Sequence, residues 1–335
     1  MLTIDPETDN NNKYFIPLIM MKFKLKYFFA LVLALTFVTY SCKTTEKGIK
    51  QEIEANDYKP LTDALLWKID GNGLTQPSYL YGTIHLIDAE DYFLPTGTLA
   101  AIDNSEKMVF EIDMNEMSDM GAMMGLLSKA FMSDNKTLKD LISEEDYKLV
   151  NDHFQEMGLP LMMLERIKPM FLTVFASGDM DPAGLQTGSM KSYEMEFLEI
   201  AKSSDKPIAG LETIEFQMSV FDSIPYQAQA EMLVETIKEG DGDSSEFDQM
   251  VQMYKDQQIN AMVSMISDED EQLSDYEDIL LNKRNEAWIS GMKQMMSENP
   301  TFFAVGAGHL AGKKGVIYLL KKEGYTLTPL SQTKS

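Results

Sequence analysis

The chain has 335 residues, of which 44% are hydrophobic and 24% charged, so it can bury the core of one large or two ordinary domains. Its formal net charge of −24 argues against a nucleic-acid partner, because phosphate groups are bound by clustered Lys and Arg. A single cysteine, Cys42, excludes both an intramolecular disulfide framework and a cysteine-based zinc site.

The N-terminal region has the pattern of a targeting segment. Lysines in KFKLK, from residue 22, precede a short apolar run at residues 27–38 and then TYSC, which is similar to a lipoprotein cleavage box ending at Cys42. We therefore expect residues 1–42 to be a signal or anchor segment with lipidation at Cys42. An uncleaved membrane anchor stays open as the alternative, because the box departs from the usual pattern at its first two residues.

Acidic side chains in residues 1–19 do not suit the basic start of a signal segment, so the true start is expected at Met20 or Met21. Residues 43–60 are polar and charged, typical of a tether. The mature chain is thus expected in the cell envelope, exported and membrane-anchored, as an outer-membrane lipoprotein. Its membrane partner would be reached through the N-terminal lipid or the uncleaved segment.

The first part of the globular region predicts strands. Residues 64–69 and 79–84 are apolar runs separated by turn residues, which predicts a hairpin. The second run belongs to SYLYGTIHL, in which Gly82 is followed three residues later by His85. Residues 107–113 predict a third strand, which contains Glu111.

The middle of the chain predicts helices from about residue 116 to residue 201. Ser143 followed by three acidic residues is typical of a helix N-cap. A further helix is expected from residue 159, and DMDPAGLQTG (residues 179–188) is expected to be a loop. His153 lies in a polar helix and is expected at the surface.

The last third combines strands and helices. A short strand at residues 208–211 ends at Glu212, and TFFAVGAGHL repeats the strand-Gly-x-x-His arrangement with Gly306 and His309. Arg284 is expected on a helix just before that strand. The other expected elements are helices at residues 215–222, 226–238, 245–266, 274–297 and 315–322, and a final strand at 325–330.

Strands at both ends of the chain, with a large helical insert between them, predict one domain over residues 61–332. The expected fold class is α/β, with α+β as the alternative, and a central mixed sheet built from both chain ends. No Pro-, Gly- or Ser-rich linker divides this region.

Four polar side chains share a place at or just after a strand end. They are His85, Glu111, Glu212 and His309. If the strands run parallel in one sheet, all four meet at the edge where open α/β sheets place their sites. Two imidazoles and one or two carboxylates suit a catalytic divalent metal, which would supply a nucleophilic water. The alternative is that both histidines are hydrogen-bonded structural residues.

Other residues of the chain could support this site. Gly82 and Gly306 permit a tight turn and a close backbone approach. Arg284 could bind a substrate carboxylate, orient Glu111 through a bidentate pair, or form a surface salt bridge. Gln217 could hydrogen-bond across the site or cap a turn, and Glu194 is expected on a solvated helix face unless its loop folds over the sheet edge.

Five segments resemble the TraB/GumN family (TraB/PrgY/GumN), which includes pheromone-shutdown proteins and is similar to the Tiki metalloproteases. They are YLYGTIHL, VFEID, PIAGLETIEFQ, KRNEAW and FFAVGAGHLAGKKGVIYLLKKEGY. The resemblance covers about residues 60–332. It implies two related Gly-x-x-His halves and a divalent metal, manganese or cobalt rather than zinc. In Tiki-like members the activity is proteolysis near the N-terminus of a secreted substrate.

The resemblance also implies roles for individual residues. His85, Glu111 and His309 would bind the metal, and Gly82 and Gly306 would shape the two turns. The catalytic residues would be Glu111, Glu212 and Arg284.

The resulting functional hypothesis is an exported, membrane-tethered, metal-dependent hydrolase, namely a peptidase acting on a secreted or envelope peptide or protein. Two alternatives remain open. One is a non-catalytic module that sequesters a peptide or small ligand. The other is a hydrolytic or transfer reaction on envelope glycans or small molecules.

Overall fold

The computed structural model describes residues 58–330 except 115–128, 177–181, 241–245 and 269–275. The chain divides into two units, Met1–Ile49 and Lys50–Ser335, and the described residues all belong to the second. The expected signal segment, Cys42 and most of the expected tether therefore lie outside the described residues. Among the helices that the structure describes, none has the length and apolar character needed to cross a bilayer.

A six-stranded mixed sheet forms the centre of the second unit, in the order β6-β4-β7-β2-β1-β8. Its strands are β1 (Leu66–Gly71), β2 (Ser78–Thr83), β4 (Lys107–Ile112), β6 (Ile208–Glu212), β7 (Thr301–Gly306) and β8 (Tyr325–Pro329). The pairs β6–β4, β4–β7 and β7–β2 are parallel, whereas β1 is antiparallel to both β2 and β8. The predicted α/β fold, with a sheet built from both chain ends and a β1–β2 hairpin, is confirmed.

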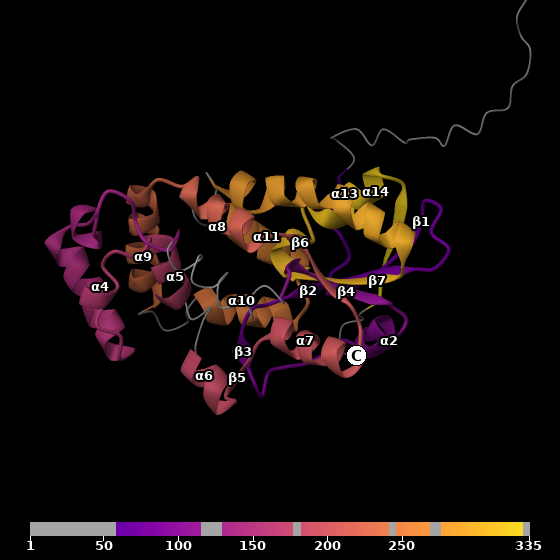
Figure 1. The fold of residues 1–335 in the computed structure, drawn as a ribbon, viewed down its shortest axis with the longest axis horizontal. Helices are drawn as coiled ribbons and strands as arrows, with labels where there is room; N and C mark the ends of the chain where they lie inside the picture. Colours follow the sequence, from indigo (N-terminus) through magenta and orange to yellow (C-terminus); the bar gives the residue numbers. More distant parts are fainter. Residues whose placement is uncertain (1–57, 115–128, 177–181, 241–245, 269–275, 331–335) are drawn as a thin grey trace, which may run out of the picture. The chain divides into compact units, whose positions relative to one another are not determined.

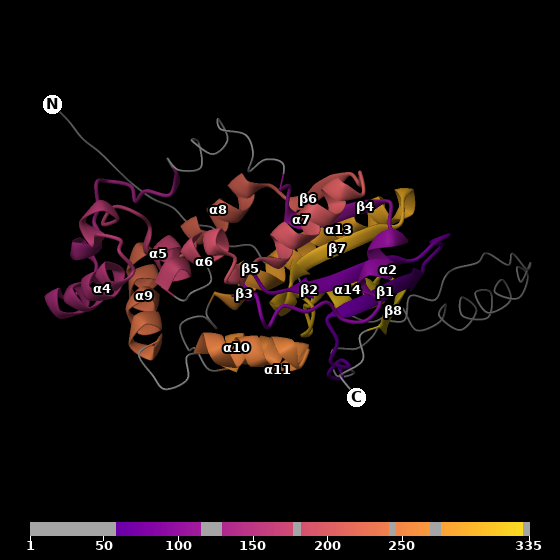
Figure 2. The ribbon, with the colours of Figure 1, turned by 90° about the horizontal axis from the view of Figure 1, so that it is seen from below.

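The two central strands are apolar because helices cover both faces of the sheet. Every residue of β2 is buried, and so are the first five residues of β7. Figures 1 and 2 show α13 (Lys283–Glu298) and α14 (Val316–Lys322) on one face, with α2 (Thr98–Asp103) and α7 (Tyr193–Ser203) on the other. Strands buried on both faces lose the polar alternation of half-exposed strands, which explains the apolar runs in the sequence.

The remaining helices form the insert and the segments that lead back to the sheet. They are α4 (Glu144–Glu156), α5 (Pro169–Ala176), α6 (Pro182–Thr187), α8 (Ile214–Asp222), α9 (Tyr226–Gly240), α10 (Glu246–Lys255) and α11 (Ile259–Asp268). Short helical turns occur at η2 (Leu138–Asp140), η3 (Leu161–Met163) and η5 (Ala307–His309), with a π-helix at η4 (Asp278–Asn282). A small two-stranded sheet pairs β3 (Ile87–Asp88) with β5 (Met190–Lys191).

Helices α4, α5 and α9 pack on one another around a second hydrophobic cluster, distinct from the cluster that surrounds the sheet. Its buried members include Phe154, Leu172 and Leu233. The expected N-cap of α4 is confirmed, because the Ser143 hydroxyl accepts a hydrogen bond from the Asp146 amide at 3.1 Å. In Figure 1 these helices lie beside the sheet rather than over it.

Several element predictions were wrong in detail. The expected loop at 179–188 contains α6, which starts at Pro182, a residue whose fixed φ suits the first helical turn. The expected helix at 245–266 is two helices, because Gln257 adopts φ 59° and its side-chain oxygen accepts from the Leu65 amide at 3.3 Å. The helix expected from residue 159 begins at Pro169, after the 3₁₀ turn η3.

His153 is not the surface residue that the sequence predicted. It is half-buried, and its Nε2 atom is buried without a hydrogen-bond partner. The reason is its position three residues after the buried Val150, which places both on one face of α4.

Tyr58, at the end of the expected tether, already contacts the domain. Its hydroxyl accepts a hydrogen bond from the Gly312 amide at 3.2 Å, and its ring packs edge-on against Tyr318 of α14 at 5.6 Å. The last residues of the tether are therefore held on the surface that carries α14.

Candidate active site at the carboxyl edge of the sheet

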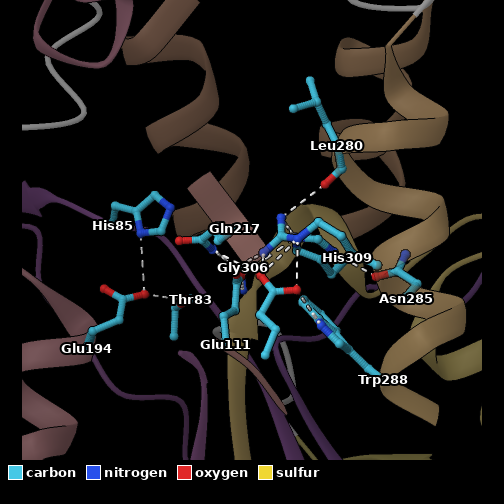
Figure 3. A network of polar contacts seen from close by, with 12 residues as sticks. Thr83, His85, Glu111, Glu194, Gln217, Leu280, Asn285, Trp288, Gly306 and His309 are labelled. Atoms are coloured by element: carbon cyan, nitrogen blue, oxygen red, sulfur yellow. Dashed lines mark hydrogen bonds and ion pairs between the residues drawn. The ribbon is translucent and has the colours of Figure 1, made fainter. Parts of the chain in front are cut away.

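Three of the four predicted residues converge where the parallel strands end. Glu111 lies at the end of β4, Glu212 is the last residue of β6, and His309 lies in the turn η5 after β7. Their side chains are 14%, 4% and 5% exposed, respectively. The strands β4, β6 and β7 run parallel, which meets the condition on which the sequence argument depended. Figure 3 shows this polar network from close by.

Arg284 of α13 joins the three side chains. Its Nη2 atom donates to Glu111 Oε2 and to Glu212 Oε1, both at 2.6 Å, and its Nε atom donates to Glu212 Oε1 at 3.0 Å. Its Nη1 atom donates to the Leu280 carbonyl at 3.0 Å and lies 3.3 Å from His309 Nε2. All three guanidinium nitrogens therefore point at acceptors within the chain.

These contacts decide between the interpretations of Arg284. The side chain is only 10% exposed, so a surface salt bridge is the wrong interpretation, and the orienting contact with Glu111 is present. Burial lowers the pKa of Arg284, but the contacts with Glu111 and Glu212 outweigh this effect and raise it overall. The guanidinium is thus a permanent positive charge enclosed by two carboxylates.

Gln217 and Trp288 complete the surroundings of the carboxylates. The Gln217 amide donates to Glu111 Oε2 and to Glu212 Oε1, each at 3.2 Å, so it hydrogen-bonds across the site. Trp288 Nε1 donates to Glu212 Oε2 at 2.9 Å. Glu212 therefore accepts from three different side chains, which fixes its carboxylate without leaving it exposed.

Glu111 is held as a carboxylate. Burial by itself raises its pKa, but electrostatic interactions with His309, Arg284 and His85, together with the hydrogen bond from the Gly306 amide, lower the pKa to about 2. The Gly306 amide donates to Oε1 at 2.8 Å. Because Arg284 is always charged, Glu111 is ionised throughout the physiological pH range.

His309 is held as a neutral imidazole. Burial lowers its pKa to about 4; Arg284 and His85 act in the same direction, whereas Glu111 opposes them. Its Nδ1 atom lies 2.7 Å from Asn285 Oδ1, and its ring packs against Trp288 with centroids 4.5 Å apart. At neutral pH one ring nitrogen of His309 therefore carries an electron pair rather than a proton.

His85, the fourth predicted residue, stands apart from the buried network. Its side chain is 66% exposed, and Nδ1 lies 3.5 Å from Glu194 Oε1. Glu194 in turn accepts from the Thr83 hydroxyl at 2.7 Å and from the Ser192 hydroxyl at 3.1 Å. Glu194 is therefore not merely on a solvated face, and its segment does reach the sheet edge beside His85 (Figure 3).

Gly82 and Gly306 need to be glycine for different reasons. A Cβ on Gly82 would lie 2.9 Å from the Leu310 side chain and 3.1 Å from the Ala307 Cα, so glycine lets the second turn pack against β2. A Cβ on Gly306 would lie 3.2 Å from Glu111 Oε1 and 3.5 Å from the His309 ring, so glycine leaves the space beside both groups open. The prediction of close approach therefore describes both positions.

The fit of a divalent metal can be judged from the same atoms. Glu111 Oε1 and His309 Nε2 are both electron-pair donors and lie 3.6 Å apart, a separation that suits two ligands of one ion. Within the described part of the chain, however, no three His, Cys, Asp or Glu side chains form a group that could hold a metal ion. The pair therefore fits two ligand positions, and His85 does not lie with it as the third.

Asn285 and Trp288 also belong to this network, and the sequence assigned them no role. Both lie on α13 with Arg284, and together they contact His309 and Glu212. The segment KRNEAW places them one and four residues after Arg284, which brings Trp288 onto the same helix face. That spacing was the available signal. For Glu194 the sequence left open a place at the sheet edge, but its pairing with His85 became visible only in the folded chain.

The parallel sheet edge, with its buried Glu–Arg–Glu–His network, defines an α/β protein with a polar site built from both chain ends. The TraB/PrgY/gumN family matches residues 65–329, and the chain belongs to this family. The predicted resemblance is therefore confirmed.

Several individual relatives are named as Metalloprotease TIKI proteins. Metalloprotease TIKI1 from Danio rerio is 22% identical over 326 residues, covering 81% of this chain and 64% of the relative. The Metalloprotease TIKI homolog from Amphimedon queenslandica is 21% identical over 326 residues, with 82% and 62% covered. Metalloprotease TIKI1 from Homo sapiens is 19% identical over 315 residues, with 78% and 61% covered. The chain thus spans less than two thirds of the length of these relatives. No solved structure matches it.

Proposed function

We propose that this chain is a metal-dependent hydrolase that cleaves a peptide or protein substrate of the cell envelope or its surroundings. The observation that carries the proposal is the facing pair of donors at the sheet edge. A neutral imidazole nitrogen and an ionised carboxylate oxygen lie 3.6 Å apart beside a glycine, an arrangement that suits a cation. The relatives named as metalloproteases support the same reaction class.

In this proposal Glu111 and His309 bind a divalent metal, manganese or cobalt, and His85 is the third ligand. A bound metal would polarise a water molecule and the scissile carbonyl. His85 is exposed, and it stands on the turn after β2, directly beside β7 in the sheet. Its side chain must move towards Glu111 to join the pair.

The chain's other residues prepare the two ligands. Arg284 and Gln217 both donate to Glu111 Oε2, which leaves Oε1 as the oxygen that faces His309. Glu212 accepts from Arg284 through two nitrogens and so holds the guanidinium plane. We therefore assign Glu212 and Arg284 to positioning within the catalytic site, and metal binding to Glu111.

The direct test uses the purified full-length chain with Mn²⁺, Co²⁺ or Zn²⁺ in turn and a mixed peptide library read by mass spectrometry. Metal stoichiometry is measured in parallel by calorimetry. We expect one bound ion and peptide cleavage, both lost in Glu111→Gln and His309→Gln. His153→Gln is the matched control, because that histidine lies in α4, outside the site, and should change neither reading. Cleavage that persists in both site variants would overturn the assignment.

Exported, membrane-tethered placement belongs to the same proposal. It rests on the sequence of residues 1–42, the tether 43–60 and a single domain over 61–332. Fractionation of cells that express the full chain should place it with membranes. If Cys42 carries the lipid, Cys42→Ala should release the chain or leave an unprocessed precursor, whereas a true membrane anchor would be unaffected.

One observation favours a second candidate, a non-catalytic binding module. Arg284 already pairs both carboxylates, so each of them has a cationic partner without a metal. A full-length chain that binds none of the three metals, and whose stability does not respond to chelator, would support this candidate over the hydrolase.

A further inference from the structure

We infer that Asn285 is a positioning residue that fixes the tautomer of His309, so that Nδ1 carries the proton and Nε2 keeps its electron pair, on the side of the ring nearest Glu111 Oε1. The consequence for metal binding rests on the proposed function. The tautomer itself does not, because it follows from hydrogen-bond chemistry within the chain.

The first constraint comes from a backbone carbonyl. The Asn285 amide nitrogen donates to the Lys314 carbonyl at 3.0 Å, and a carbonyl oxygen can only accept. This contact sets the orientation of the amide and turns its oxygen towards His309. Since Oδ1 also can only accept, His309 Nδ1, at 2.7 Å, must be the donor and must carry the proton.

The second constraint is independent and lies on the other side of the ring. Arg284 Nη1 lies 3.3 Å from His309 Nε2, and a guanidinium has donors but no acceptor. Nε2 must therefore be the acceptor, which is the same tautomer. Asn285 and His309 are 1% and 4% exposed, so water cannot readily replace either partner. The opposite tautomer would leave two buried pairs of like groups facing each other.

The carbonyl that orients Asn285 belongs to the AGKKG segment directly after the second Gly-x-x-His motif. The segment turns tightly, with Gly312 at φ 90° and the Gly315 amide donating to the Gly312 carbonyl at 3.1 Å. A Cβ on Gly315 would lie 2.0 Å from the Ala311 carbonyl oxygen, so this turn requires glycine there. The Lys314 side chain is directed elsewhere, to Asp278 at 2.6 Å.

The same chain segment therefore supplies two parts of the arrangement. One is the His309 imidazole, and the other, five residues later, is the Lys314 carbonyl, which orients Asn285 of α13 and through it sets the tautomer. Metal-binding histidines commonly donate their second nitrogen to such a partner, which fixes the ring and its reactive nitrogen. Asn285 is this partner for His309, because its side-chain oxygen accepts from Nδ1. Glu194 has the corresponding place beside Nδ1 of His85, at 3.5 Å.

The test is ¹⁵N NMR of the imidazoles in the metal-free, full-length chain. The three histidines are assigned from single His→Gln variants. For the wild type we expect a pyrrole-type Nδ1 and a pyridine-type Nε2 at His309. Asn285→Leu cannot accept from Nδ1 and leaves only the contact with Arg284 Nη1 to favour the Nδ1–H form, so the population of the Nε2–H form, which can donate to Glu111, should rise. Asn285→Asp still accepts and should keep the wild-type tautomer.

Lys314→Ala is the matched control for the tautomer, because the backbone carbonyl rather than the side chain orients the amide. It should keep the wild-type pattern. A wild-type His309 protonated on Nε2, or an Asn285→Leu variant whose tautomer populations equal those of the wild type, would overturn the inference. If Asn285→Leu does not fold, the wild-type and Asn285→Asp spectra still decide it, because loss of the Nδ1–H form in either contradicts the assignment.

The second readout is Mn²⁺ binding to the same proteins. Asn285→Leu should weaken binding by roughly 10–100-fold, as loss of a partner of a ligating histidine typically does. Asn282→Leu is the control and should bind Mn²⁺ as the wild type does. Asn282 lies three residues earlier, and among the described contacts its side chain bonds only Glu277. Wild-type affinity in Asn285→Leu would refute the role in metal binding. Absence of Mn²⁺ binding in every variant would instead refute the proposed function and leave the tautomer result standing.

Discussion

Replacing Arg284 by methionine should destabilise the fold by about 3–5 kcal/mol at neutral pH, because it removes the only cation between two buried carboxylates. The guanidinium contacts Glu111 and Glu212 at 2.6 Å each, and the three side chains are 10%, 14% and 4% exposed. Methionine fills a similar volume but leaves both carboxylates without a countercharge. The loss therefore reflects unpaired buried charge more than lost packing.

The pH dependence gives this prediction its sign. In the wild type, burial raises the pKa of Glu111, and the surrounding positive charge, to which Arg284 contributes, brings it down to about 2. Without Arg284 the effect of burial is opposed less, so the pKa of Glu111 should rise above its unfolded value. A carboxyl with a raised folded pKa is stabilised by protonation. The destabilisation should therefore be greatest near pH 7.5 and shrink as the pH falls towards 5.

Urea unfolding followed by circular dichroism at pH 7.5 and pH 5 measures the difference directly. Arg166→Met is the matched control, since Arg166 is the chain's other arginine and its exposed guanidinium bonds Asn135 at 3.0 Å. The control should change the free energy of unfolding by less than about 0.5 kcal/mol. A loss below about 1 kcal/mol for Arg284→Met, or an equal loss at both pH values, would refute the reasoning.

Two further predictions concern His309 and Gly82. The folded pKa of His309 is lowered from 6.5 to about 4, so stability present above pH 6.5 is lost as the pH falls to 4, by about 3 kcal/mol. Urea titrations should show this slope in the wild type and not in His309→Gln. Gly82→Ala should cost about 1–3 kcal/mol, because its Cβ would lie 2.9 Å from a neighbouring side chain. Gly291→Ala, in α13 with no atom within 4 Å of its Cβ, should be neutral or stabilising, and thermal unfolding scans of the two variants measure the difference.

The sequence was sufficient to predict the strand ends and the residues that gather there. His309, Glu111 and Glu212 could be predicted because each follows an apolar run, and parallel buried strands align their carboxyl ends. The two similar strand-Gly-x-x-His segments at opposite ends of the chain predicted a sheet built from both ends, and the structure pairs them as β2 and β7. Local sequence patterns were thus sufficient to predict the sheet and the approximate position of the site.

The connections made by α13 could not be predicted in the same way. Arg284 was compatible with a surface ion pair until the fold placed α13 across the ends of β4 and β6. The roles of Asn285 and Trp288 depend on contacts with residues 24 and 76 positions away in sequence, and no periodicity encodes such distances. Helix breaks such as the one at Gln257 likewise arise from a tertiary hydrogen bond rather than from local propensity.

The two Gly-x-x-His motifs differ most in burial, and this difference separates their expected roles. The His309 side chain is 5% exposed under α13, whereas the His85 side chain is 66% exposed beside Glu194. An exposed side chain contributes little to folding, so His85→Ala should change the free energy of unfolding by less than about 0.5 kcal/mol. The same variant should lose metal-dependent cleavage if His85 moves in as the third ligand. Full activity in His85→Ala would leave Glu111 and His309 as the only protein ligands among the residues proposed, and a marked loss of stability would show that the exposed imidazole has a structural role instead.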